Sequence, residues 1–61
     1  MKLADIKACT DTAVLIEVIS MQEFLAWDRE VSDMPKGAAT ARTRAIAAKA
    51  RLEALHQAAI Q

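Results

Sequence analysis

The side chains that could support catalysis are few and lie far apart in the sequence. His56 is the sole imidazole, and no Ser, Cys or Asp stands close to it in sequence to suggest a nucleophile arrangement. Cys9 is the only cysteine. A thiol near a helix start can be reactive, but a lone Cys is more often a small buried hydrophobe. One Cys and one His cannot supply the four ligands of a structural zinc site. We therefore expect no enzyme activity, no catalytic residue, no metal and no cofactor.

A stretch rich in alanine and threonine, residues 37–51, carries four cations. Its start could hold an anion, because the free N–H groups of a helix N-terminus and nearby hydroxyl and guanidinium groups are all donors. The candidate anion-binding residues are Thr40, Arg42, Thr43, Arg44 and Lys49. Arg42 and Arg44 lie about 160° apart on an ideal helix, so one anion would need cations from more than one subunit.

The nucleic-acid interpretation of these cations is weakened by the rest of the sequence. The chain has no net charge, and neither of its two aromatic residues lies among the cations. An oligomeric anion-binding module that sequesters a nucleotide signal or binds nucleic acid is therefore the alternative prediction.

A second candidate surface lies in the segment MQEFLAWDREVSDM. Phe24, Trp27, Val31 and Met34 recur at spacings of three and four, which places them on one side of a helix. Aromatic residues and Met are enriched where proteins associate. These residues belong either to a core or dimer interface or to a binding site for another protein. Both interpretations predict an association surface.

The elements that must position these residues are helices. One Gly, one Pro and many alanines give an all-α composition. Pro35 and Gly37 mark the one clear break. We predict a single domain over residues 1–61, a helical hairpin made of a short N-terminal helix and two main helices. The expected bounds are helices at about 3–9, 11–33 and 38–60, with a turn at 34–37.

Each main helix is expected to have more than one apolar face. In the last helix, small residues form one face with spacings of three and four, and further apolar residues lie opposite. The members of the first face are Ala38, Ala41, Ala45, Ala48, Leu52, Leu55 and Ala59. In the preceding helix, Val14, Val18, Met21 and Leu25 form a second stripe beside the aromatic one. A hairpin can cover one face of each helix, so we predict a homodimer or a larger helical bundle.

Charge is unevenly distributed along the chain. Residues 1–34 hold seven acids and three bases, whereas residues 35–61 hold five bases and one acid. This asymmetry suits antiparallel helices whose opposite charges face each other across their flanks. The N-terminus lacks the apolar run of a signal peptide, and the longest apolar run is too short to cross a bilayer. We therefore expect a soluble, cytoplasmic protein with no membrane partner.

The MPKG turn and the ARTR helix start resemble those of small phage-encoded helical hairpins that oligomerise and either sequester nucleotide signals or block a host protein. The resemblance covers residues 20–50. Ala and Lys replace the acidic and aromatic positions that follow the basic start in the nucleotide-sequestering group. The function we predict is a small interaction protein, an inhibitor or adaptor of a phage or mobile element that binds and occludes a host macromolecule.

Overall fold

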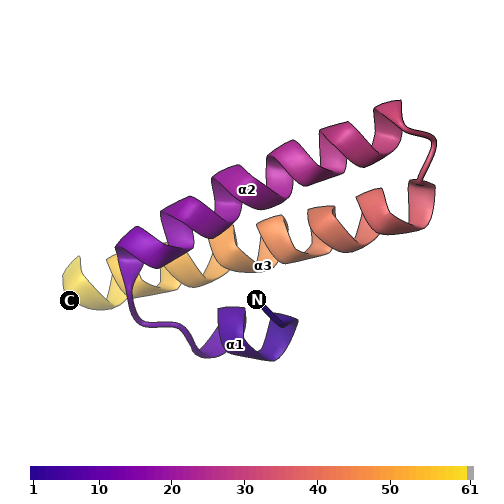
Figure 1. The fold of residues 1–61 in the computed structure, drawn as a ribbon. Coiled ribbons are helices and arrows are strands. Elements are labelled where there is room, and N and C mark those ends of the chain that lie inside the picture. The colour runs from indigo at the N-terminus through magenta and orange to yellow at the C-terminus, as the bar shows by residue number, and fades with distance from the viewer. Residues whose placement is uncertain (61) are drawn as a thin grey trace.

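The computed structural model describes residues 1–60 and contains three helices and no strand in that range. Helix α1 is Leu3–Ala8, α2 is Thr12–Val31 and α3 is Pro35–Ile60. Helices α2 and α3 lie side by side and antiparallel, and α1 lies beside the middle part of α3 (Figure 1). The prediction of an all-α helical hairpin is confirmed. The molecule is a rod of 43 × 17 × 14 Å.

Helix α2 begins where the side chain of Asp11 supplies a cap. Oδ1 of Asp11 accepts hydrogen bonds from the backbone N–H groups of Ala13 at 3.0 Å and Val14 at 3.3 Å. These two donors would otherwise have no partner within the helix. The cap therefore fixes the point at which the chain leaves α1 and enters the hairpin.

The connection between α2 and α3 is shorter than the expected turn at 34–37. Helix α2 ends at Val31 because Asp33 adopts a left-handed conformation, with φ at 59°. The N–H of Asp33 donates to the carbonyl of Glu30, and that of Met34 to the carbonyl of Arg29, which is the Schellman arrangement. Pro35 then opens α3, because the first position of a helix does not need an N–H donor.

Gly37 lies inside α3 rather than in the turn. A Cβ atom at this position would lie 2.9 Å from Cδ of Arg29, so the absence of a side chain lets the two helices approach. The Arg29 guanidinium donates to the Gly37 carbonyl oxygen at 3.0 Å. This contact ties the last turn of α2 to the first turn of α3.

The interface between the two long helices is built from small residues on the α3 side. Ala38, Ala41, Ala45 and Ala48 are buried, as their spacing predicts, and we call them the alanine seam. The buried residues of α2 are Leu15, Val18, Gln22 and Ala26. Of the stripe expected on α2 only Val18 is among them; Met21 is exposed. Apolar residues nearly surround α2, so periodicity alone did not identify the side that meets α3.

Helix α1 packs against the first half of α2 and the middle of α3. Ile6 is fully buried and belongs to one core cluster with Leu15, Val18 and Ala48. Nε of Arg51 donates to the carbonyl oxygen of Cys9 at 2.7 Å, which holds the end of α1 against α3. The short helix therefore adds a large buried apolar side chain to a core whose α3 side consists mainly of alanine.

Gln22 is the one buried polar side chain among the described residues. It is 5% exposed, and no protein donor within residues 1–60 lies within hydrogen-bond distance of its Oε1 atom. Burying a polar atom without a partner lowers stability. Gln22 therefore weakens the interface in which it lies.

Replacing Asp11 by Ala should lower the free energy of unfolding by about 1 kcal/mol, because two N–H donors of α2 lose their acceptor. For a chain of this size the melting temperature should fall by roughly 4–8 °C. Circular dichroism during heating measures this change. Asp11→Asn is the control, since its carbonyl oxygen can still cap the helix; equal melting temperatures for Asp11→Ala and the unmodified protein would contradict the role of the cap.

Replacing Gln22 by Met should raise the free energy of unfolding by about 1 kcal/mol, because a similar volume is kept while the unpaired oxygen is removed. Urea denaturation followed by circular dichroism gives the difference. The exposed Gln57, replaced in the same way, should change stability by less than about 0.5 kcal/mol. A less stable Gln22→Met protein would show that the amide makes a favourable interaction.

Candidate interaction surface

The side of α2 that points away from α3 carries a stripe of exposed residues. Its members, spaced three or four apart, are Ala13, Ile16, Ser20, Phe24, Trp27 and Val31, and we call them the outer stripe of α2. The three largest at its C-terminal half, Phe24, Trp27 and Val31, are 61%, 60% and 68% exposed. They are solvent-facing because the inner side of the same helix already packs on the alanine seam.

The two aromatic rings of this stripe form a pair. The centroids of Phe24 and Trp27 are 6.1 Å apart with an angle of 39° between the ring planes. Residues three apart on a helix are neighbours, and rings at this separation attract each other. The pair therefore presents one continuous aromatic patch, whose conformation is partly fixed before any partner binds.

Met34 lies beyond the end of α2, so it does not continue the helical stripe. It is 53% exposed and stands in the connection that follows Asp33. The four residues predicted as one surface are thus three on the helix and one in the adjoining loop. All four are exposed, and Trp27 is not part of the core of the protomer.

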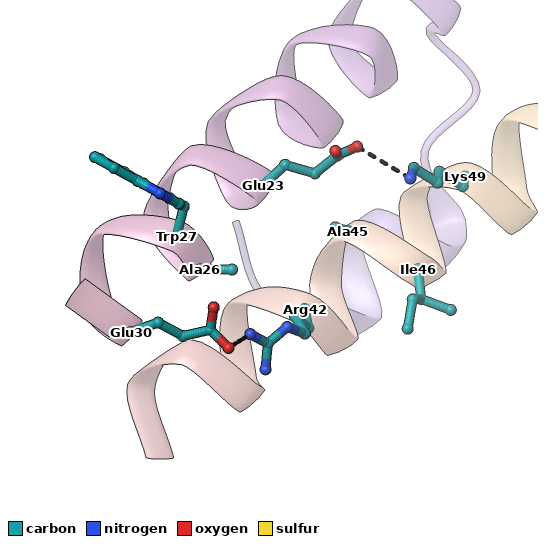
Figure 2. Close-up of a pocket in the computed structure, with 8 residues that line it drawn as sticks. All are labelled: Glu23, Ala26, Trp27, Glu30, Arg42, Ala45, Ile46 and Lys49. Atoms are coloured by element: carbon teal, nitrogen blue, oxygen red, sulfur yellow. Dashed lines mark ion pairs between the residues drawn. The ribbon is translucent and has the colours of Figure 1, made fainter. Parts of the chain in front are cut away.

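A shallow groove of about 340 Å³ separates α2 from α3 beside the outer stripe. Ala26 and Ala45 lie between the helices, whereas Trp27 points away from α3 and Ile46 points away from α2 (Figure 2). Two ion pairs cross the groove. Nζ of Lys49 lies 3.0 Å from Oε1 of Glu23, and Arg42 pairs with Glu30.

These ion pairs define the register of the hairpin. Glu23 and Glu30 are seven residues apart on α2, and so are Arg42 and Lys49 on α3, so both pairs form in one antiparallel alignment. They are the opposite charges across helix flanks that the asymmetric charge distribution predicted. Ile46 is not among the site residues predicted from the sequence. It lies between the two cations on α3 and is 66% exposed.

The five candidate anion-binding residues do not converge on one point. The hydroxyls of Thr40 and Thr43 each donate at 3.0 Å to a backbone carbonyl four residues earlier, of Lys36 and Ala39. Arg42 and Lys49 form the ion pairs of the groove, and Arg44 is half-buried. An anion would have to displace Glu30 to reach Arg42, and Glu23 to reach Lys49.

The two side chains considered for catalysis lie in different elements. His56 is exposed on α3, and Cys9 is half-buried after α1. Within residues 1–60, no group of three His, Cys, Asp or Glu side chains could hold a metal ion. In the same range, every helix is too short or too polar to span a bilayer.

The chain matches no protein-family model, no curated protein and no solved structure at a significant level. Its function must therefore be inferred from its own surfaces. The outer stripe of α2 holds four of the nine large hydrophobic residues that are exposed within residues 1–60.

Removing the two ion pairs together, in Glu23→Gln with Glu30→Gln, should lower the free energy of unfolding by about 1 kcal/mol or less, because the charges are half exposed and screened by water. The difference should shrink further in 0.5 M salt, where screening is strong. Urea denaturation at two salt concentrations measures both effects. A loss of several kcal/mol would contradict the view that the alanine seam, rather than these charges, holds the hairpin together.

Proposed function

We propose that this protein is a non-enzymatic interaction protein that oligomerises and acts by occluding or bridging a macromolecular partner. The observation that carries the proposal is the outer stripe of α2, with Phe24, Trp27 and Val31 exposed side by side on one rigid helix. Contiguous exposed apolar surface of this kind marks association sites. Trp is also the residue most often found to dominate binding energy.

Covering this surface would supply a substantial favourable term, against which the entropic cost of association acts. An aromatic side chain can bury roughly 150–250 Å², so about 60% exposure leaves roughly 100 Å² or more of each ring to be covered. At about 25 cal/mol per Å² each ring contributes roughly 2–3 kcal/mol when covered. The paired rings lose little conformational freedom on binding, since each has two side-chain torsions.

The wider biological role is part of the same proposal. The MPKG turn and the ARTR helix start, which resemble phage-encoded helical hairpins, favour an inhibitor or adaptor that blocks a host protein in the cytoplasm. Anion sequestration is the less favoured alternative, because Arg42 and Lys49 are engaged by Glu30 and Glu23. It would be favoured again if a nucleotide or polyphosphate bound with strong dependence on salt.

Replacing Trp27 by Ala should weaken self-association or partner binding by 2 kcal/mol or more, about 30-fold in the dissociation constant, because the largest anchor is removed. Sedimentation equilibrium measures self-association, and pull-down measures partner binding. Ile60→Ala is the matched control, since Ile60 is 79% exposed and lies outside the outer stripe. Unchanged sedimentation together with unchanged pull-down for Trp27→Ala would overturn the proposal.

A further inference from the structure

Helix α3 also has an outer face, and it differs in kind from that of α2. On the side away from α2 it exposes Ala39, Thr43, Ile46, Ala50 and Ala54 at spacings of three and four, which we call the outer face of α3. The Thr43 hydroxyl donates to the Ala39 carbonyl, so this side chain needs no hydrogen-bond partner from another molecule. Apart from Ile46, the face is made of small side chains that allow another helix to approach closely.

The two outer surfaces are complementary in size. The outer stripe of α2 projects large side chains, above all Phe24 and Trp27. The side chains of Ala50 and Ala54 are small, so they project little from α3. Helices pack when the ridges of one enter the grooves of the other. Two α2 helices packed on each other would instead set large side chains against large side chains, with no low-profile face to receive them.

The charges that border the two surfaces are complementary as well. By helical spacing, acids flank the outer stripe of α2 on both sides, Glu23 and Glu30 on one and Glu17 and Asp28 on the other. Cations flank the outer face of α3. Arg42 and Lys49 lie on one side, with the single acid Glu53, and Arg44 and Arg51 lie on the other.

Contact between two α2 helices would set acids beside acids, which is unfavourable. Contact between α2 and α3 of different copies would set Glu17 and Asp28 on the same flank as Arg44 and Arg51. The charges of the other flank are already paired within each chain. The charge pattern therefore selects α3 of a second copy as the occupant of the outer stripe.

We propose that the outer stripe of α2 packs antiparallel against the outer face of α3 of another copy of this chain. This inference rests on the proposed function, because it assumes that the outer stripe is an interaction surface. In the register that pairs Glu30 with Arg42 inside the hairpin, Asp28 would lie beside Arg44 of the neighbouring copy. Within residues 1–60, neither Asp28 nor Arg44 takes part in an ion pair of its own chain.

The accessible surface of the free chain is larger than expected for its mass, which supports a second copy as the partner. Its accessible surface is 4326 Å², whereas a folded monomer of 6.6 kDa is expected to expose roughly 3,900 Å². The excess comes from the elongated shape, and covering the outer surfaces would remove it. A chain this short usually needs such a contribution to stability.

This contact is heterologous, since different surfaces of the two copies meet. After one contact forms, each pair of copies still has a free outer stripe at one end and a free outer face at the other. Further copies can therefore add, which gives a ring if the rotation between copies closes and an open filament if it does not. The inference thus specifies head-to-tail association rather than a two-fold dimer.

The first test reverses the two charges that the inferred register brings together. Asp28→Arg and Arg44→Asp should each weaken self-association about tenfold, because attraction across the flank becomes repulsion. The double variant should return to within about threefold of the original affinity. Sedimentation velocity over a range of concentrations gives the affinities, and circular dichroism verifies that each variant is folded. Asp5→Arg, which makes the same charge change on α1, should leave association unchanged.

The second test uses single cysteines in a Cys9→Ser background and does not depend on the charge variants. Ser20→Cys places a thiol on the outer stripe, and Ala50→Cys places one on the outer face of α3. A short bis-maleimide reagent, which spans packed helices 8–10 Å apart, should join the two variants when they are mixed. Neither variant alone should form a cross-linked dimer.

The outcomes separate this inference from the proposed function. Cross-linking of Ser20→Cys to itself, or tighter association of Asp28→Arg, would show that α2 meets α2; the inference would then be wrong while the interaction protein remains. A monomer at all concentrations would also overturn the inference. In that case a Trp27-dependent pull-down would still support the partner-binding part of the proposed function, though not its oligomerisation, and the absence of such a pull-down would overturn both proposals.

Discussion

The close approach of α2 and α3 along the alanine seam is the constraint on which the rest of the structure depends. Ala38, Ala41, Ala45 and Ala48 are all buried, and Gly37 removes the one Cβ that would press on Arg29. Small side chains bring the helices close but bury little apolar area per residue. The hairpin is therefore well defined in geometry and poor in core. Ile6 and Leu15 are the largest side chains that it buries completely within the described residues.

A seam of small residues determines where the large ones lie. The inner side of α2 packs on this seam, so the bulky side chains of Phe24 and Trp27 on the opposite side lie outside, with more than half of their surface in water. The single polar residue in the interface, Gln22, adds a further unfavourable term. Under the proposed function, stability and function are linked in this chain, because the proposed recognition surface is also apolar surface that the fold does not bury.

The sequence predicted the helices, the hairpin and the alanine seam, because Ala38, Ala41, Ala45 and Ala48 recur at spacings of three and four. It did not predict the inner side of α2, since Val14, Leu15, Ile16, Val18 and Ile19 surround that helix and periodicity could not choose among them. The predicted turn at 34–37 lies later in the chain than the observed connection between Val31 and Pro35, because the prediction includes Gly37 in the turn. Pro35 can begin a helix, and Asp33 rather than Gly takes the left-handed conformation. Gly37 instead lies inside α3, where it contacts the Arg29 side chain.

The charges connect the internal packing to the external surfaces. Acids seven residues apart on α2 and cations seven residues apart on α3 require one register for the hairpin, and that register leaves Asp28 and Arg44 outside the internal pairs. Each helix therefore carries the charge that its own partner helix needs on one flank and the same charge again on the other. A helix pair with this repetition can make the same kind of contact outside as inside. This repetition of charge is the feature from which we infer head-to-tail association of copies of this chain.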